Sequence, residues 1–596
     1  MQARVVIALF TLAVVLHWPT GQTDFVYDDI DFVVKNASVQ SLDAVGLALH
    51  APFPPDQPER GLYRPLTTLV YALEYAAFGA GARGYHLVST LLYGVLVVLV
   101  YRLASVWFGA ASGSAAAAAL LFAIHPVHCD VVDTVAGQSE LLALSLAVAS
   151  LVLFLRANPP GDDPPARLAR LGSALLYLLA CGAKETAVLL PVVLGLHLLA
   201  RDGAPAGATA CLRRIFDRTS AHLGVTLIYF AGRYDALGGF GPAQSVLEGI
   251  EPVAKAATVG AVFSEYLRLL LYPDVLQLDF YYQQAIGLLP APTLASVVGW
   301  LAAAFLVGGS AAATRGALRG RPTSLASPRG GWIAGVGTGL VFLLPVSHLF
   351  SIGALMAERF LFAPSLGFIL FVTSLGAYGL QRTTLDPKRQ REVALVVLAA
   401  LAVSGGLRSH TRASEWRDGV ALWSALARKT PNDYRPYSNA ATHWIERERF
   451  DEAYDALQRA QALAPGDAAV RTNLAIISLH RGRLDEAEGI LRALLAEDPA
   501  DHYAWLNLGA VELQRGRASR ALAYLERALD ANPYYEPARQ QTAMVRQQLS
   551  AARRFLLGAR TVPPERRDAA FRERLAKACR LTESDECGSA FRSDFE

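Results

Sequence analysis

Long apolar stretches fill the first two thirds of the chain and stop near residue 410. A window of about 19 residues, which matches the thickness of a bilayer, separates them. They lie near 4–19, 87–107, 112–125, 139–156, 170–183, 186–200, 221–237, 256–272, 293–313, 332–350, 359–379 and 393–408. Most of these stretches are predicted to be membrane-spanning helices.

The positions of the arginines predict which ends of the apolar stretches face the cytoplasm, because basic residues accumulate in cytoplasmic loops. Four loops are rich in arginine: 156–170, 201–218, 315–329 and 382–391. All four can be cytoplasmic only if one apolar stretch does not cross the membrane. The stretch 256–272 contains Glu265 and Arg268 and is better explained as an interfacial or re-entrant helix. About eleven spans remain, with the amino terminus inside. The predicted external loops are 20–86, 125–138 and 238–292.

The first apolar stretch, 4–19, has two interpretations. Arg4 followed by a short apolar run would suit a signal peptide. The following residues, "HWPTGQTDF" (17–25), offer no convincing cleavage site, so the stretch is interpreted as the first membrane helix.

Beyond residue 410 the pattern changes to a repeat of 34 residues. Three residue types recur at this spacing: Pro431, Pro465, Pro499 and Pro533; Asn439, Asn473 and Asn507; Ala453, Ala487 and Ala521. This is the period of tetratricopeptide repeats, whose helix pairs stack into an α-solenoid with a concave surface for a peptide or partner. The array could also serve only as a spacer. The predicted repeats are 432–465, 466–499 and 500–533, with a degenerate helix in 414–431 and a capping helix at 534–556.

Composition agrees with a membrane protein, and the predicted spans and repeats make the expected fold all-α. The 596 residues are 53% hydrophobic and 18% charged, which is too apolar for a soluble protein with an ordinary surface. The net charge of +3 is small and the basic residues are spread along the chain, so no nucleic-acid partner is expected. The predicted domains are a polytopic helical membrane domain (1–410), the repeats (411–556) and a C-terminal extension (557–596).

The segment "FVYDDIDF", residues 25–32, places three carboxylates at the predicted outer membrane edge. Asp28, Asp29 and Asp31 are surrounded by apolar residues. Such a cluster can cap a juxtamembrane helix or perform acid–base chemistry.

A series of motifs resembles one family in both content and order. After the first helix and "VYDD" come "YRPL" (63–66), "FAIHPVHCDVVDTVAGQSELLA" (122–143), "AKET" (183–186), "EYLRLLLYP" (265–273), "LLPVSHLFSIGALMAERFLFAPSLGF" (343–368) and the repeats. This arrangement resembles the transmembrane and tetratricopeptide repeat-containing proteins. They are similar to protein O-mannosyltransferases, which are C-type glycosyltransferases. The resemblance runs over nearly the whole chain.

The resemblance implies a C-type helical fold with the active site on the non-cytoplasmic side and a polyprenyl-phosphate sugar as donor. A single sugar, mannose or a related hexose, would pass to Ser or Thr hydroxyls of exported proteins captured in the repeat groove. The expected location is a bacterial inner membrane with the site and repeats facing the periplasm or exterior, or the lumenal side of the ER membrane in a eukaryote. No metal or other cofactor is expected. Two alternatives stay open: a non-catalytic membrane adaptor that uses its repeats, and a transporter or ligase for lipid-linked sugars.

Sugar transfer from a lipid phosphate to a hydroxyl passes through an oxocarbenium-like state and needs a carboxylate to accept the hydroxyl proton. By the resemblance, Asp28 matches the first acid of the family's acidic pair and is the expected general base. Asp29 matches the second acid and is expected to position the acceptor or tune Asp28, because adjacent carboxylates raise one another's pKa.

The leaving phosphate needs cations at the outer membrane edge. Lys184 lies with Glu185 between two short apolar stretches and is the first candidate, although the two residues could simply form an ion pair. The other candidates for donor phosphate binding are Arg233, Arg359 and Arg64.

The short external loop "HPVHCDVVDTVAGQSE" (125–140) concentrates further polar residues. Acceptor positioning or bracing of the acidic segment is expected for five residues: His125, His128, Asp130, Glu140 and, from another segment, Glu358. His125, His128 and Asp130 could instead bind a divalent metal, but no HExxH helix or cysteine pair accompanies them. The loop departs from the family pattern at Gln138 and Asp130, where Arg and Glu are expected. The missing Arg removes one possible phosphate contact.

Two cysteines lie in the predicted external tail. Cys579 and Cys587 bound the segment "CRLTESDEC" and could close a disulfide in an oxidising compartment. The cysteines at other positions indicate nothing about catalysis.

Overall fold

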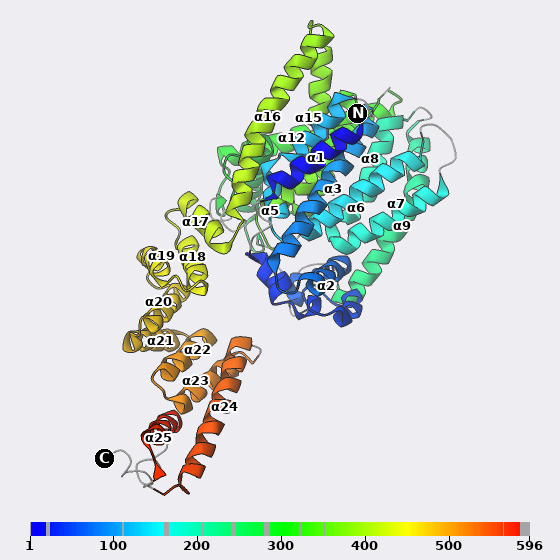
Figure 1. Cartoon of the computed structure of the whole chain (residues 1–596). Helices are drawn as coiled ribbons and strands as arrows, with labels where there is room; N and C mark the ends of the chain where they lie inside the picture. Colours follow the sequence, from blue (N-terminus) through cyan, green and yellow to red (C-terminus); the bar gives the residue numbers. More distant parts are fainter. Residues whose placement is uncertain are drawn as a thin grey trace. The chain divides into compact units, whose positions relative to one another are not determined.

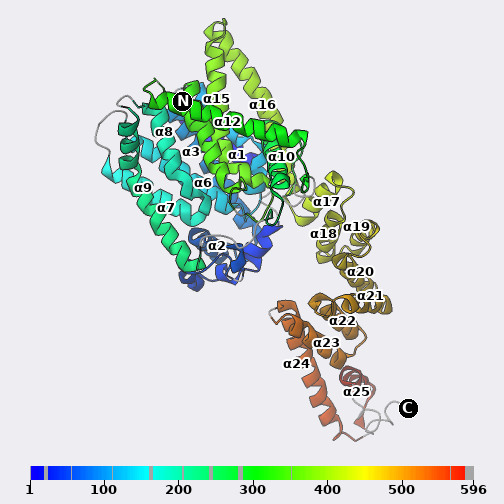
Figure 2. The same cartoon turned by 180° about the vertical axis from the view of Figure 1, so that it is seen from behind.

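The computed structural model describes residues 2–18, 24–55, 57–109, 112–159, 166–204, 207–239, 246–278, 286–321, 323–350, 352–533, 535–563 and 566–583. Within these ranges the secondary structure is helical and contains no strand, which confirms the predicted all-α class. The chain divides into two compact units, Met1–Asp418 and Gly419–Glu596, which are described separately (Figures 1 and 2).

The first unit holds the apolar helices. Its α-helices are α1 (Gln2–Leu16), α2 (Pro65–Phe78), α3 (Ala82–Phe108), α4 (Gly113–Ala123), α5 (Cys129–Val132), α6 (Gln138–Ala157), α7 (Arg167–Ala183), α8 (Leu190–Asp202), α9 (Ala208–Leu237), α10 (Pro252–Leu271), α12 (Leu294–Leu318), α13 (Pro328–Gly330), α14 (Gly337–Leu343), α15 (Phe362–Gln381) and α16 (Pro387–Glu415). Two π-helical segments are η2 (Ile30–Val34) and η8 (Gly331–Val336). The 3₁₀ segments are η3 (Ala37–Val39), η4 (Leu42–Leu49), η5 (Pro58–Arg60), η6 (Pro126–His128), η7 (Glu185–Leu189), η9 (Leu344–Val346) and η10 (Glu358–Leu361).

Among the described residues, six helical segments are long and apolar enough to cross a membrane: α3, α6, α12, Pro328–Val346, Glu358–Gln381 and α16. A seventh would be α4 together with Pro126–Val132, a pair bent by 50°. α7 and α8 have 17 and 13 residues, fewer than the roughly 20 that span a bilayer as one helix. The apolar helices agree with an integral membrane protein, but the prediction of about eleven spans is not confirmed.

Small side chains let the central helices of this unit pack closely. α4 carries a run of alanines, and Ala115, Ala118 and Ala119 are fully buried where α4 packs against α3. Close packing of this kind holds helices together in a membrane, where lipid is as apolar as the side chains. On α7, by contrast, Leu168, Leu171 and Leu175 form an exposed stripe at helical spacing, as expected of a lipid-facing surface.

The second unit is a stack of helix pairs in chain order (Figures 1 and 2). Its helices are α17 (Gly419–Lys429), α18 (Tyr434–Glu446), α19 (Phe450–Leu463), α20 (Ala468–His480), α21 (Leu484–Glu497), α22 (His502–Gln514), α23 (Ala518–Ala531), α24 (Glu536–Ala559) and α25 (Ala569–Thr582). Each predicted repeat contains one pair, from α18 and α19 to α22 and α23. The predicted degenerate helix corresponds to α17 and the predicted capping helix to α24.

Similar residues begin and end the first helix of every repeat, and they explain locally why the helix pairs recur at the same spacing. An aspartate caps the start of each: Asp433, Asp467 and Asp501 accept backbone N–H groups of the first turn. A residue with positive φ follows each helix end: Glu448, Gly482 and Gly516, at φ 57°, 73° and 78°. The recurring alanines, Ala453, Ala487 and Ala521, are fully buried between helices.

The ends of the predicted domains shift slightly. α16 continues to Glu415, beyond the predicted boundary at 410, and the second unit begins at Gly419. In the predicted extension, α25 is helical. Cys587 lies outside the described residues, so its disulfide with Cys579 stays a prediction.

Candidate active site

The short loop between α4 and α6 lies at the centre of the candidate site. It consists of η6, α5 and the turn 133–137, and nearly all of its residues are buried. The turn is tight, because a Cβ atom on Gly137 would overlap the backbone carbonyl of Val131. Glycine is therefore required where the chain enters α6.

Asp29 is anchored to this loop by hydrogen bonds to backbone. Its Oδ1 accepts the N–H of Ala136 at 2.7 Å, and its Oδ2 accepts the N–H of Val26 at 3.2 Å. The side chain is fully buried. Burial raises the pKa of Asp29 to about 7, although the backbone hydrogen bonds oppose this rise. The second acid of the pair thus braces the loop from a buried position.

Asp28 has a more open environment than its neighbour. Its carboxylate is 30% exposed and lies 3.7 Å from Nη2 of Arg359, whose side chain is 23% exposed. Nη1 of Arg359 lies 3.8 Å from Oδ2 of Asp130, which also accepts the backbone N–H of Arg359 at 3.0 Å. One guanidinium therefore stands between carboxylates from two separate loops.

Arg64 and Lys184 are each paired with a carboxylate. Arg64 donates two hydrogen bonds to Glu185, at 3.0 and 2.8 Å, and Lys184 pairs with Glu140. The exposed fractions of Arg64 and Lys184 are only 8% and 11%. Instead of the alternative pair of Lys184 with Glu185, the structure has two pairs, Arg64 with Glu185 and Lys184 with Glu140. A phosphate would have to compete with these carboxylates for either cation.

The ion pairs are joined to the acidic pair through the loop. Nη1 of Arg64 lies 3.5 Å from the Ser139 hydroxyl, which donates to the carbonyl of Ala136 at 3.2 Å. The N–H of Ala136 in turn binds Asp29. Tyr71 donates to the carbonyl of Val135 at 2.7 Å and lies within electrostatic range of the acidic pair and Arg64. The residues of these motifs therefore form one neighbourhood.

Arg233, near the end of α9, has a guanidinium nitrogen that can donate a further hydrogen bond. Its Nη2 donates to the carbonyl of Gly61 at 2.8 Å, and its side chain is 6% exposed. Its Nη1 is buried and has no hydrogen-bond partner among the described residues. Unlike the other three predicted phosphate-binding cations, it forms no ion pair within the described chain.

The two predicted loop histidines are used within the fold. The ring nitrogens of His128, which is fully buried, lie 2.9 Å from the Tyr93 hydroxyl and 2.8 Å from the Ser365 hydroxyl. One ring nitrogen of His125 caps η6, and the other lies 3.2 Å from the carbonyl of Leu270. Neither ring presents an unused nitrogen to a metal ion or an acceptor.

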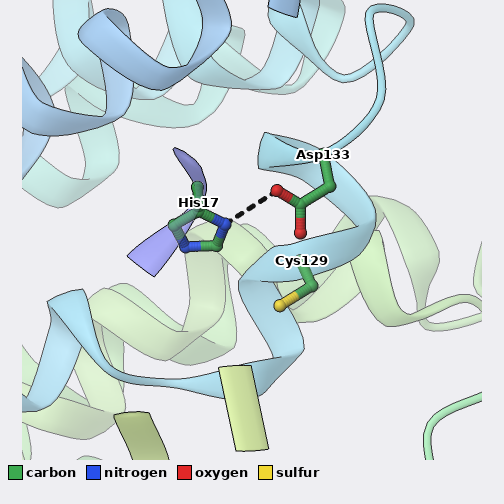
Figure 3. A group of neighbouring side chains, drawn as sticks. All are labelled: His17, Cys129 and Asp133. Carbon is green, nitrogen blue, oxygen red and sulfur yellow. Dashed lines mark hydrogen bonds and ion pairs between the residues drawn. The ribbon is translucent and has the colours of Figure 1, made fainter. Parts of the chain in front are cut away.

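A further buried group ties the residue after α1 to the same loop (Figure 3). Nδ1 of His17 lies 2.8 Å from Oδ1 of Asp133, and Cys129 lies beside them with its ligand atom within 4.8 Å of theirs. Two ligands of one tetrahedral zinc stand roughly 3.3 Å apart. The shorter His17–Asp133 distance is that of a hydrogen bond, and Cys129 Sγ donates to the carbonyl of Ser409 at 3.4 Å. Sequence reasoning missed this group, because nothing in the sequence brings residue 17 to residue 133.

Gln138 occupies the position where the resemblance led us to expect an Arg. Its side-chain amide donates to Oε1 of Glu74 and to the carbonyl of Tyr85, both at 3.0 Å. Burial raises the pKa of Glu74 to about 8, and the hydrogen bond from Gln138 acts in the opposite direction. Gln138 thus joins α6 to α2 through a neutral amide.

Glu358 is fully buried and bound on two sides. It accepts the backbone N–H of Gln277 and lies 3.4 Å from Nη2 of Arg412 in α16. Sequence reasoning also missed Arg412. It follows the last apolar stretch, and its partner Glu358 lies 54 residues away in the chain.

Comparison with known proteins gives the chain its relatives. The tetratricopeptide repeat family matches residues 445–510. Protein O-mannosyl-transferase Tmtc3 of Drosophila melanogaster is 25% identical over 530 residues, which are 76% of this chain and 54% of that protein. Protein O-mannosyl-transferase TMTC4 of Mus musculus is 27% identical over 473 residues, 70% of this chain and 60% of that protein. The chain thus spans little more than half the length of these relatives.

A shorter match and one solved structure complete the comparison. Protein O-mannosyl-transferase Tmtc2 of Drosophila melanogaster is 36% identical over 198 residues, 30% of this chain and 20% of that protein. The crystal structure of the APC/C hetero-tetramer Cut9-Hcn1 aligns with 89% of this chain and 90% of its own at 13% identity, but its TM-score of 0.22 supports no argument about fold. Over about three quarters of its length the chain is similar to the TMTC protein O-mannosyl-transferases, and its second unit carries tetratricopeptide repeats.

Proposed function

We propose that this protein is a membrane glycosyltransferase that moves a single hexose, mannose or a close relative, from a polyprenyl phosphate to Ser or Thr hydroxyls of exported proteins. The reaction would take place on the non-cytoplasmic face of a bacterial inner membrane, or in the ER lumen of a eukaryote. The observation that carries the proposal is the partly exposed pair of Asp28 and Arg359, 3.7 Å apart. Similarity to proteins named protein O-mannosyl-transferases supports a protein acceptor and the sugar.

Asp28 is suited to be the base because its carboxylate is 30% exposed, so that the hydroxyl of an acceptor can approach it. The acceptor oxygen bonds to the anomeric carbon while the bond from that carbon to the phosphate oxygen breaks. The phosphate leaves with the electron pair of that bond, and the hydroxyl proton passes to Asp28. Asp29 holds Asp28 in place, because its own carboxylate is bound to the backbone of Ala136.

Two guanidinium groups are best suited to the donor phosphate. Arg359 is partly exposed and contacts its two carboxylates at 3.7 and 3.8 Å, so a phosphate oxygen can draw its N–H groups away from them. Arg233 offers the buried Nη1 that lacks a partner within the described chain. Charge that develops on the leaving phosphate would be stabilised by both groups. No metal or cofactor is part of the proposal.

The repeats are proposed to capture the acceptor protein. Helix pairs of this kind form a concave surface that suits an extended peptide. In this proposal the repeats raise the local concentration of the Ser or Thr segment, and the membrane unit performs the chemistry.

The proposal is tested by mass spectrometry of exported proteins from cells that carry the native gene, lack it, or carry Asp28→Asn. Asp31→Asn is the matched control, since Asp31 pairs instead with Lys35 at 3.2 Å and Arg60 at 3.1 Å. Hexose should disappear from the same Ser or Thr sites in the deletion and Asp28→Asn strains and remain with Asp31→Asn. Loss in the deletion alone would exclude Asp28 as the base. No loss in either strain would overturn the proposed activity and favour an adaptor.

A further inference from the structure

The last helix of the first unit is buried only near its C-terminal end. Along most of α16 the apolar side chains are exposed, as Val396, Val403 and Leu407 show at 69%, 70% and 66%. The buried residues are Gly406, Ser409, Arg412 and Ala413, which lie on one face over the last turns. This short face is where α16 can act on the rest of the unit.

That face contacts both loops that hold Arg359. Ser409 donates to the carbonyl of Ile124 at 2.9 Å, just before the central loop, and its own carbonyl accepts from Cys129. Arg412 reaches Glu358, the residue directly before Arg359, at 3.4 Å. One helix face therefore fixes the loop that supplies Asp130 and the segment that supplies Arg359.

The Arg412–Glu358 pair is the tightly buried part of this contact. Arg412 is 3% exposed and Glu358 is fully buried, and the guanidinium also pairs with Glu415 at 2.6 Å. A buried carboxylate without its cation is strongly disfavoured and would move towards water. Movement of Glu358 would carry the backbone of Arg359 with it, including the N–H that binds Asp130.

From this geometry we infer that Arg412 is a positioning residue for sugar transfer: through Glu358 it sets where the Arg359 guanidinium stands between Asp28 and Asp130. The inference rests on the proposed function for its catalytic consequence. Its structural core, that Arg412 orders the segment around Arg359, is independent of the chemistry. Arg412 touches neither donor nor acceptor in this inference, so it acts only through the position of the Arg359 guanidinium.

The experiment compares Arg412→Gln, Arg412→Lys, the double variant Arg412→Gln/Glu358→Gln and the control Glu415→Gln in the full-length protein. Glu415→Gln removes the other partner of Arg412 and leaves the pair with Glu358 intact. Hydrogen–deuterium exchange of a peptide covering 355–361 reports the order of the segment without any need for turnover. Transfer kinetics use a short-chain polyprenyl phosphate mannose and a peptide from an exported protein found to carry hexose.

In Arg412→Gln, exchange at 355–361 should increase, and kcat/KM for the donor should fall at least tenfold while KM for the acceptor peptide stays unchanged. Arg412→Lys, which keeps the charge, should recover part of the donor kcat/KM, and Glu415→Gln should match the unmodified protein. The double variant replaces both the Arg412 cation and the Glu358 carboxylate, so no unpaired charge stays buried and its melting temperature should equal that of the unmodified protein. Its kcat/KM for the donor should nevertheless stay low. A merely structural role predicts recovery of its rate together with its stability.

Two outcomes separate this inference from the proposed function. Unchanged exchange at 355–361 in Arg412→Gln, or a double variant with unmodified donor kinetics, would overturn the positioning role. If the unmodified protein transfers no hexose while Arg412→Gln still increases exchange at 355–361, the proposed function fails and the ordering of Arg359 by Arg412 is upheld.

Discussion

The buried carboxylate of Asp29 predicts that the first unit loses stability as the pH rises. Its pKa is raised from 3.8 to about 7, because folding removes it from water. Below pH 4 the group is protonated in both the folded and the unfolded chain. Between pH 4 and 7 the unfolded chain releases the proton while the folded chain retains it, so the free energy of unfolding falls over this window. Above pH 7 the loss levels off.

The size of the effect follows from the two pKa values. A tenfold change in a proton equilibrium is worth about 1.4 kcal/mol, so the full loss for Asp29 is about 4 kcal/mol. Asp29→Asn keeps an oxygen for the N–H of Ala136 but cannot ionise. Glu74, whose pKa of about 8 acts in the same direction, is present in both proteins and cancels in the comparison.

The assay is thermal unfolding of both proteins in the same detergent across the range from about pH 4 to pH 8. Relative to the unmodified protein, Asp29→Asn should gain about 4 kcal/mol over this range, mostly between pH 4 and 7. The control Asp31→Asn removes another carboxylate of the same segment, which is 32% exposed, and so shows what the loss of an acid alone does to unfolding. A constant difference between Asp29→Asn and the unmodified protein at every pH would refute the reasoning, since Asp29 would then be ionised throughout.

Two further substitutions test the site and the repeats. Gly137→Ala should destabilise the first unit and abolish hexose transfer, because the added Cβ would displace the turn that presents the Ala136 N–H to Asp29. Gly376→Ala, which has open space at its Cβ, is the control. Thermal unfolding and transfer assays on both variants check this prediction. Leu491→Ala should cost about 2–5 kcal/mol in the repeats by leaving a cavity, seen as faster hydrogen exchange there, whereas half-exposed Leu463→Ala should cost far less. Equal exchange in these two variants would contradict the repeat core.

The repeats could be read from the sequence because their determinants are local. Caps at Asp433, Asp467 and Asp501 and turns at Gly482 and Gly516 recur with the period of the chain itself. The span count could not be read in this way. Short helices such as α7 and α8 are apolar enough to resemble spans, yet they have only 17 and 13 residues.

The sequence indicated motifs that the structure brings together, but it did not indicate which of their residues pair. The motifs around Asp28, Arg64, Lys184 and Arg359 do meet in one neighbourhood. Which acid binds which cation depends on contacts between distant segments, as the Arg64–Glu185 and Lys184–Glu140 pairs show. From the sequence, the alternative to phosphate binding was a pair of adjacent residues, Lys184 with Glu185. Arg412 was missed for the same reason, since its partner lies 54 residues away in the chain.

Asp28 and Asp29 are neighbours in sequence, and the structure gives them opposite surroundings that predict opposite phenotypes. The Asp29 carboxylate is buried and binds two backbone N–H groups, so its removal should change the stability of the fold. Asp28 keeps 30% exposure and a guanidinium 3.7 Å away, so its removal acts on proton transfer and leaves the loop anchored. Asp29→Asn should therefore alter the pH dependence of unfolding while retaining measurable transfer, and Asp28→Asn should abolish transfer while retaining that pH dependence. If both substitutions instead had the same effect on both measurements, the pair would act as one unit and burial would not be what separates their roles.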